Sequence, residues 1–336
     1  MKKVLVTGIT GMVGSHLTDF LLKNTNWKIY GLCRWRSPLD NIDHILHLAN
    51  KKKRINFIYA DLNDYSSLIK ALETSRPDYV FHLAAQSYPL TSFTEGNITF
   101  ETNILGTYNL LNAIKQLKLN PLIHICSSSE VFGRVEKKNL PIDENCSYHP
   151  ASPYAISKVG TDLIGRYFYE AYKQKIMVTR MFTHTGPRRG DVFAESSFAK
   201  QIALIEQKKI KPIIKVGNLK SLRTFADVRD AVRAYFLLLT KNPKPGEVYN
   251  IGGSYSCTIG EMLNFLLNQS KVKNIKVVQD KNRLRPLDAD LQVPDTTKFF
   301  NQTMWKPQYN FKQTMKDLLE YWRKEIKNNP KEYINR

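Results

Sequence analysis

Near its N-terminus the chain reads Val4-Leu5-Val6-Thr7-Gly8-Ile9-Thr10-Gly11-Met12-Val13-Gly14. The apolar run at its start is typical of a buried strand, and the residues that follow repeat apolar side chains at helical spacing. In such a unit the first glycine permits a tight turn, the second lets a ligand approach the main chain, and the third lets the helix lie against the strand. The N–H groups at the start of the helix then face an anion. We therefore expect a dinucleotide site that includes Gly8, Thr10, Gly11, Met12, Val13 and Gly14.

Length and composition indicate a folded globular protein. The chain has 336 residues, of which 42% are hydrophobic. No apolar run approaches the ~20 residues that cross a bilayer, and Met1-Lys2-Lys3 leads into a strand instead of a secretory signal. The four cysteines are widely spaced without a Cys-x-x-Cys pair, which indicates neither a zinc site nor a disulfide framework. We expect a cytoplasmic protein that has no membrane partner.

The formal net charge of +20 is compatible with nucleic acid, a membrane surface or an anionic small substrate. The basic runs Lys51-Lys52-Lys53-Arg54 and Lys208-Lys209 fall between apolar segments, and no known nucleic-acid motif surrounds them. We expect a solvated lysine-rich surface and no nucleic-acid partner. A polyanionic small substrate fits the charge equally well.

Strands and helices alternate along most of the chain. We predict strands at 28–33, 56–60, 79–83, 122–126, 176–181 and 248–251, and helices at 65–74, 97–117, from 153 onward, at 198–207 and at 311–326. This alternation predicts an α/β fold, a Rossmann-like doubly wound parallel sheet whose ligands lie beyond the carboxyl ends of the strands. We expect a cofactor domain at 1–180, to which the chain returns around 225–255. A smaller C-terminal α/β substrate lobe would comprise 181–224 and 256–336.

The second predicted strand ends at Arg34-Trp35-Arg36. At this distance from the glycine loop an NAD site places an acidic residue on the ribose, whereas an NADP site favours arginine for the 2′-phosphate. Arg34 and Arg36 therefore favour NADP. The competing interpretation is that two arginines in a loop of a basic protein carry no such meaning.

The fifth predicted strand ends at Ser127-Ser128-Ser129-Glu130, and the helix from 153 carries Tyr154 and Lys158 on one face. An ammonium beside a phenol favours the phenolate, so Tyr154 would remove a hydroxyl proton near neutral pH. The same spacing recurs at Tyr169 and Lys173 without a Ser/Glu loop upstream. Only the combination with the glycine loop and the Ser-Ser-Ser-Glu strand end therefore predicts chemistry.

Together these segments resemble the extended short-chain dehydrogenase/reductase family and, within it, the GDP-mannose 4,6-dehydratases. The resemblance rests on the glycine loop, Arg34, Asp61-Leu62, Ala84-Ala85-Gln86-Ser87, Ser128-Ser129-Glu130, Tyr154 with Lys158, Pro187-Arg188-Arg189-Gly190, Arg223, and Arg285-Pro286 with Asp288 and Asp290. It implies NADP as the cofactor, contacted also by Asp61, Leu62, Leu83, Ala84, Ala85, Ser87, Tyr154 and Lys158. It implies a GDP-linked sugar as substrate, contacted by Ser87, Ser128, Ser129, Glu130, Tyr154, Thr183, Arg188, Arg223 and Arg285. Homodimers or homotetramers are also implied.

The resemblance further implies an internal redox cycle. Tyr154 takes the proton of the sugar C4 hydroxyl while the C4 hydride passes to NADP⁺, and Ser128 hydrogen-bonds the same oxygen. Glu130 removes the C5 hydrogen and protonates the departing C6 hydroxyl, after which the hydride returns to C6. The product is a 4-keto-6-deoxy sugar.

Several alternatives remain open. Thr183 stands where related enzymes carry asparagine, and Phe132 stands where they carry tyrosine. The sugar can therefore be mannose or, in its place, a different hexose or a heptose such as manno-heptose. A GDP-4-keto-6-deoxymannose reductase is also similar but needs no C5 base, and an epimerase oxidises without elimination. Glu130 and the Arg285 motif favour the dehydratase. From a different class, a non-catalytic NADP- or RNA-binding protein is disfavoured by the intact Ser128, Tyr154 and Lys158. We expect no metal site.

Overall fold

A computed structural model describes residues 1–50 and 54–329 of the chain. Its centre is a seven-stranded parallel sheet in the order β10-β6-β5-β4-β1-β2-β3. The strands are β1 (Lys3–Thr7), β2 (Lys28–Cys33), β3 (Ile55–Tyr59), β4 (Tyr79–His82), β5 (Leu122–Cys126), β6 (Lys175–Met181) and β10 (Val248–Ile251). The predicted Rossmann-like doubly wound sheet is confirmed. Strand order reverses between β1 and β4, which is where such sheets bind ligands.

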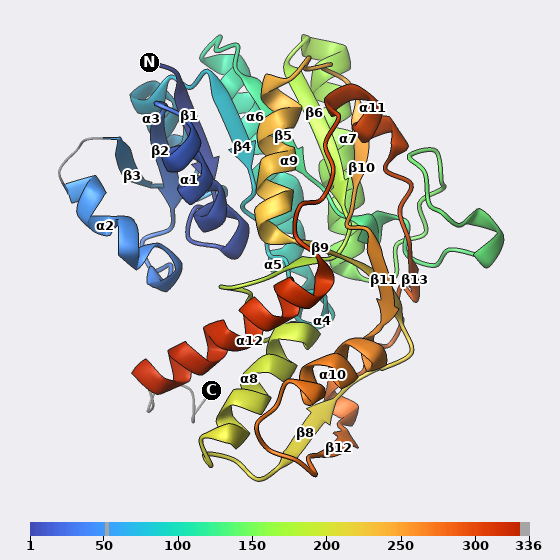
Figure 1. The fold of residues 1–336 in the computed structure, drawn as a ribbon. Coiled ribbons are helices and arrows are strands. Elements are labelled where there is room, and N and C mark those ends of the chain that lie inside the picture. The colour runs from blue at the N-terminus through green and yellow to red at the C-terminus, as the bar shows by residue number, and fades with distance from the viewer. Residues whose placement is uncertain (51–53, 330–336) are drawn as a thin grey trace.

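Helices cover both faces of this sheet (Figure 1). On one face lie α1 (Met12–Asn24), α2 (Asp43–Asn50), α9 (Val228–Thr240) and α11 (Thr297–Thr303), and on the other lie α3 (Tyr65–Ser75), α6 (Gly106–Gln116) and α7 (Pro153–Tyr172). Successive β1 residues serve opposite faces, because side chains alternate along a strand. Val4 and Val6 pack with α1 and α9, whereas Leu5 packs with α3 and α6. The alternation predicted from the sequence thus builds two cores on one sheet.

The helix predicted at 97–117 is not regular. It comprises α5 (Gly96–Phe100), a π-helical turn at Glu101–Leu105 and then α6. Asn103, buried in the π turn, accepts a 2.8 Å hydrogen bond from the Gln86 backbone N–H and donates to the Ser157 hydroxyl at 2.9 Å. The widened turn therefore holds the loop after β4 against α7. Such π turns are rare and short, so the sequence pattern predicts one uninterrupted helix here.

A second group of elements lies beyond the carboxyl ends of the sheet (Figure 1). Helices α8 (Ala194–Glu206), α10 (Ile259–Asn268) and α12 (Phe311–Asn328) share an apolar core with β8 (Ile213–Val216), which pairs with β12 (Lys276–Gln279). Between this group and the large sheet lies a small sheet of β7 (His184–Thr185), β9 (Leu222–Asp227), β11 (Tyr255–Thr258) and β13 (Leu291–Gln292). The chain then returns to the large sheet through α9 and β10.

The structure describes only one residue of the basic run at 51–54. Lys51, Lys52 and Lys53 lie outside the described residues, so the expectation of a solvated surface there stays a prediction. Arg54 is described, and its guanidinium donates to main-chain carbonyls at the end of α1, at 2.9 Å to that of Leu22. This arginine therefore fastens β3 to α1. No helix within 1–50 and 54–329 has the length and apolar content that a membrane span requires.

Candidate active site

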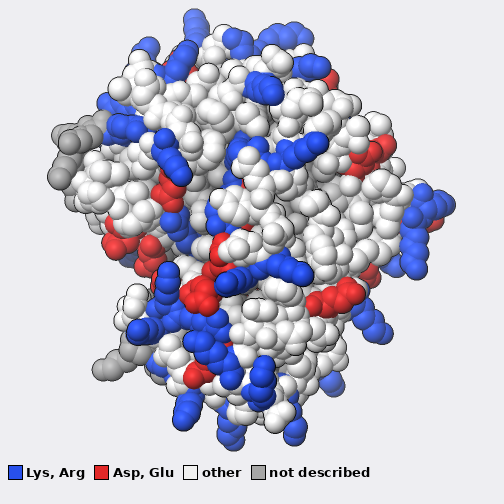
Figure 2. Space-filling model, in the orientation of Figure 1, with Lys and Arg blue, Asp and Glu red and all other residues white. Residues whose placement is uncertain are grey.

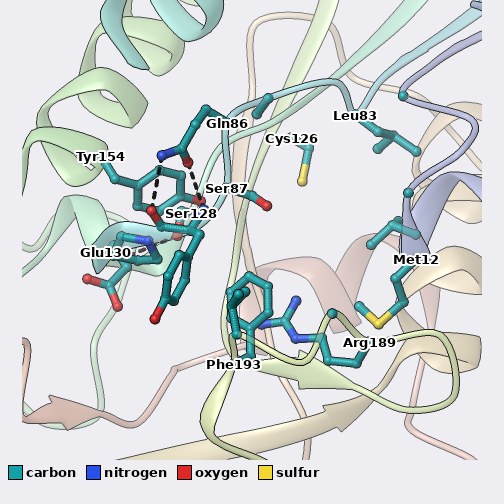
Figure 3. A pocket seen from close by; sticks show the side chains of 18 of the residues that line it. Met12, Leu83, Gln86, Ser87, Cys126, Ser128, Glu130, Tyr154, Arg189 and Phe193 are labelled. Atoms are coloured by element: carbon teal, nitrogen blue, oxygen red, sulfur yellow. Dashed lines mark hydrogen bonds between the residues drawn. The ribbon is translucent and has the colours of Figure 1, made fainter. Parts of the chain in front are cut away.

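A cavity of about 890 Å³ opens at the carboxyl ends of β1, β4, β5 and β6 (Figure 3). Every residue that the sequence analysis assigned to the site lines this cavity except Arg36. In Figure 3, Ser128, Glu130 and Tyr154 lie together on one side, and Met12 and Leu83 lie on the other. The fold therefore brings together segments that are far apart in the chain.

The glycine loop leaves the main chain bare at the start of α1. A Cβ atom added to Gly14 would lie 2.2 Å from the Gly8 carbonyl oxygen, and one added to Gly8 would lie 2.9 Å from Ala84. Gly11 is the N-cap of α1 and supplies no side-chain hydrogen bond, so the first N–H groups of the helix face the cavity. This is a cradle that fits a pyrophosphate.

The two arginines after β2 are placed differently. Arg34 lines the cavity, as do Ser37 and Asn41 of the same segment and the residues of the glycine loop. Arg36 is exposed and is not part of the lining. The role of both arginines in binding a 2′-phosphate stays a prediction, and Arg34 is the one of the two that lines the cavity.

A short 3₁₀ turn after β5 presents Glu130 to the cavity. The Ser128 hydroxyl caps this turn by accepting a 3.2 Å hydrogen bond from the Glu130 N–H. The turn ends at Gly133, where φ is +53° and a Cβ atom would lie 1.7 Å from the His149 carbonyl oxygen. Phe132, below the turn, is fully buried against Phe182. Glycine and an apolar anchor thus fix the direction in which Glu130 points.

Tyr154 lies in the first turn of α7. Ser152 caps this helix by accepting a 3.0 Å hydrogen bond from the Ala155 N–H, and the Tyr154 N–H donates to the Ser92 hydroxyl at 3.0 Å. The Ser128 side chain hydrogen-bonds the Tyr154 phenol. Lys158, one turn further, lies with its ammonium 6.0 Å from the centre of the Tyr154 ring. Serine, tyrosine and lysine therefore meet at one wall of the cavity.

The electrostatics of this wall differ from the expectation that Lys158 brings Tyr154 close to neutral titration. Burial raises the pKa of Tyr154 well above its ordinary value, although the Ser128 hydrogen bond opposes this. Burial also lowers the pKa of Lys158. Desolvation, the largest cause of both shifts, disfavours the charged form of each group.

Five arginines that follow β6 in the chain line the cavity: Arg188, Arg189, Arg223, Arg283 and Arg285. Arg285 lies 3.5 Å from Glu130 and 3.3 Å from Asp288, and Arg223 lies 3.3 Å from the same Asp288 carboxylate. Arg188 instead makes a 2.8 Å ion pair with Asp19 of α1, which fastens its guanidinium to the cofactor side of the cavity. Arg189 pairs with Glu195 at 3.1 Å.

Two aromatic residues of the cavity were not found from the sequence. Tyr88, after β4, and Phe193, before α8, meet edge to face with ring centres 5.5 Å apart. The Arg189 guanidinium stacks on Phe193 at 3.4 Å (Figure 3). Because Tyr88 and Phe193 belong to no motif and are 105 positions apart in the numbering, only the folded chain relates them.

On the face of the molecule in Figure 2, basic side chains are more widespread than acidic ones. They are spread over both halves and are most crowded over α8 and α12. With a net charge of +20, this surface attracts anions in general. Cationic groups also line the cavity, Arg34, Arg223 and Arg285 among them, and a guanidinium there can pair with an anionic ligand specifically.

Comparison with known proteins connects this geometry to a family. The model of the family described as GDP-mannose 4,6 dehydratase matches residues 5–318. The GDP-6-deoxy-D-mannose reductase of Pseudomonas aeruginosa is 29% identical over 327 residues, which cover 97% of this chain and 99% of that protein. The GDP-mannose 4,6 dehydratase 2 of Caenorhabditis elegans is 30% identical over 343 residues, which cover 95% and 88%. A solved structure of RMD from Pseudomonas aeruginosa complexed with NADPH is 29% identical, covers 96% of this chain and 100% of that one, and has a TM-score of 0.81. With nearly its whole length matched, this chain belongs to the GDP-mannose 4,6 dehydratase family.

Proposed function

We propose that this protein is an NADP-dependent GDP-sugar 4,6-dehydratase whose substrate is GDP-mannose or GDP-manno-heptose. The observation that carries the proposal is Glu130, a carboxylate in the same cavity as Ser128, Tyr154 and Lys158. Oxidation of an alcohol needs one acid/base group, whereas elimination of water needs a second. Relatives named GDP-mannose 4,6 dehydratase support the same assignment.

The cofactor contacts follow from the cavity lining. The bare N-terminus of α1, with Gly8, Gly11 and Gly14, fits the pyrophosphate, and Arg34 fits the 2′-phosphate. Further contacts would come from residues after β3 and β4, namely Asp61, Leu62, Leu83, Ala84, Ala85 and Ser87. When bound, NADP⁺ supplies a hydride acceptor that later gives the hydride back. The neighbour complexed with NADPH supports this choice of cofactor.

The catalytic roles follow from position. Tyr154 takes the proton of the sugar C4 hydroxyl, and Ser128 donates a hydrogen bond to the same oxygen. Lys158, one helical turn away, adds positive charge that favours the phenolate. Glu130 then removes the C5 proton, made acidic by the C4 ketone, and delivers a proton to the departing C6 hydroxyl.

The remaining substrate contacts would come from the second group of elements, at 181–224 and 256–336. Arg223 and Arg285 offer guanidinium groups to the diphosphate, for which bidentate pairing is favourable. Thr183 lines the same cavity and would contact the sugar, as would Ser87 and Ser129, which lie outside this group, after β4 and β5. Arg188, paired with Asp19, would act on the substrate only indirectly.

A second candidate function is reduction of a GDP-4-keto-6-deoxy sugar. This reductase function is favoured by a relative named GDP-6-deoxy-D-mannose reductase, which is 29% identical and covers 97% of this chain. A reductase consumes NADPH and leaves Glu130 without a role, so the two functions differ in stoichiometry.

The test is incubation of the purified protein with GDP-mannose and a catalytic amount of NADP⁺, without a reductant, followed by mass spectrometry. A product lighter by one water, with no net NADPH, is expected. An untouched sugar, combined with NADPH consumption when the 4-keto-6-deoxy sugar is supplied, would favour the reductase. GDP-manno-heptose tested in parallel decides the sugar.

We also propose a cytoplasmic homodimer. All four cysteines are free thiols, as expected in a reducing compartment. Helices α6 and α7 pack together, and with the preceding π turn they carry an exposed apolar face of Leu105, Tyr108, Ile156, Leu163 and Tyr167. Apolar side chains grouped in this way on a soluble protein mark an association surface. A second copy of this chain offers the same face for pairing about a two-fold axis.

A further inference from the structure

Glu130 and Arg285 face one another across the cavity from distant parts of the chain. Glu130 lies in the turn after β5, and Arg285 lies in the loop before β13. Arg285 Nη1 is 3.5 Å from the Glu130 carboxylate, and the two side chains are only 24% and 15% exposed. The arginine that the proposed function assigns to the diphosphate is therefore also the cation beside the proposed base.

Other charged groups keep Arg285 in place. Asp288, on the same loop, holds Arg285 at 3.3 Å and Arg223 at 3.3 Å, and Ser221 donates to its other oxygen at 3.0 Å. Burial lowers the pKa of Arg285, but Glu130 and Asp288 outweigh this and raise it above its ordinary value. The arginine is thus a permanent cation with two carboxylate partners.

Two further titratable groups around the pair come from two other parts of the fold. Tyr154 of α7 faces Glu130, and Tyr88, after β4, faces Arg285. Both are phenols that carry no charge at neutral pH. Arg285 is accordingly the cation that the described residues place against Glu130.

We propose that Glu130 and the substrate diphosphate compete for Arg285, so that diphosphate binding frees the Glu130 carboxylate to act on the sugar. This inference rests on the proposed function. A guanidinium that turns its planar donors to a phosphate in a bidentate pair cannot keep the same donors on Glu130. Asp288 retains Arg285 in both arrangements.

The exchange has a chemical consequence. A carboxylate oxygen that is held by a guanidinium is occupied, whereas one released from it is available to a new partner. Glu130 would therefore be released toward the sugar only when a diphosphate is in place. Arg285 thereby becomes a positioning residue that couples substrate capture to Glu130.

The test measures GDP binding by titration calorimetry to the full-length protein saturated with NADP⁺. If Glu130 competes for Arg285, Glu130→Gln binds GDP about three- to fivefold tighter than the wild type, a change typical of losing one partly exposed ion pair. The matched control is Glu95→Gln, the same change on the same cavity wall. Within the described residues Arg285 pairs with Glu130 and Asp288 and not with Glu95, so this control retains wild-type affinity.

The double variant separates competition from long-range repulsion. In an Arg285→Gln background, Glu130→Gln should no longer tighten GDP binding. Equal GDP affinity of Glu130→Gln and wild type, or tightening that persists without Arg285, would overturn the coupling while leaving the proposed function intact. Failure of the wild type to bind GDP would overturn both. Titration of each variant with NADP⁺ verifies its fold.

Discussion

The Lys158 ammonium donates a 2.8 Å hydrogen bond to the backbone carbonyl of Cys126, the last residue of β5. This bond ties α7 to the strand whose following turn carries Ser128 and Glu130. It also holds the ammonium 6.0 Å from the Tyr154 ring centre, so its influence on the phenol is electrostatic. The Lys158 side chain therefore both joins α7 to β5 and places a positive charge near the Tyr154 phenol.

The first prediction concerns the pH dependence of sugar oxidation. Since burial raises the pKa of Tyr154, its active phenolate becomes more abundant as pH rises from 6 to 9, and the rate of the first hydride transfer rises with it. Lys158→Met should lower this rate about 10²-fold at neutral pH and shift the rise to higher pH. Stopped-flow absorbance of NADPH after mixing with GDP-mannose measures both. A rate that falls with increasing pH would exclude Tyr154 as the base.

The second prediction isolates the elimination step. Glu130→Gln should leave NADP⁺ affinity unchanged and slow dehydration about 10²- to 10⁴-fold, because the amide cannot accept the C5 proton. Reduced cofactor should then accumulate on the enzyme, since its hydride has no acceptor at C6. Glu95→Gln on the same cavity wall is the control. Unchanged turnover in Glu130→Gln would remove this residue from the mechanism.

The third prediction separates Arg34 from Arg36. Only Arg34 lines the cavity, so Arg34→Ala should weaken NADP⁺ by about tenfold or more while NAD⁺ changes little, consistent with loss of one charge-assisted phosphate contact. Arg36→Ala, the neighbouring exposed arginine, should change neither affinity. Fluorescence titration with NADP⁺ and with NAD⁺ measures these affinities for each variant. Equal losses for NADP⁺ and NAD⁺ in Arg34→Ala would contradict the assignment.

Local sequence determines several of these features. The run from Val4 to Gly14 predicts strand, turn and helix because its glycines lie where the main chain passes too close for a side chain. Gly14, for example, lies against the Gly8 carbonyl within the same short unit. The spacing of Tyr154 and Lys158 likewise predicts a shared helical face. The parallel, doubly wound character of the large sheet follows from the alternation of strands and helices, whereas its strand order is known only from the structure.

Contacts between distant segments could not be predicted in this way. The π turn depends on Asn103 meeting Gln86 and Ser157, which no periodicity expresses. Arg188 and Arg189 are adjacent in sequence, yet Arg188 has φ of +68° and pairs with Asp19 on α1, whereas Arg189 pairs with Glu195. Adjacent arginines thus meet carboxylates from different elements, which their spacing in the sequence does not express.

The fourth prediction concerns stability against acid. His124 is fully buried against Tyr235, and burial lowers its pKa to about 3, whereas the unfolded chain has the ordinary value of 6.5. Below pH 6.5 the unfolded state binds a proton that the folded state excludes, so stability falls between pH 6.5 and 3. The free energy of unfolding should lose about 1.4 kcal/mol per pH unit for each such histidine. His124→Gln should reduce this slope, measured by urea unfolding between pH 7 and 4.5. Exposed His47→Gln should leave it unchanged, and an unaltered slope in His124→Gln would contradict the argument.

The last prediction tests the apolar face of α6 and α7. Leu163 is 48% exposed on α7, and a second copy of the chain would bury it. Leu163→Glu should therefore dissociate the homodimer, because two carboxylates would face each other across the two-fold axis without partners. Val277→Glu, at a similarly exposed apolar position (42%) on β12, should leave the assembly intact. Size-exclusion chromatography with light scattering reports the mass of each. A monomeric wild type, or a dimer that survives Leu163→Glu, would show that this face is not the interface.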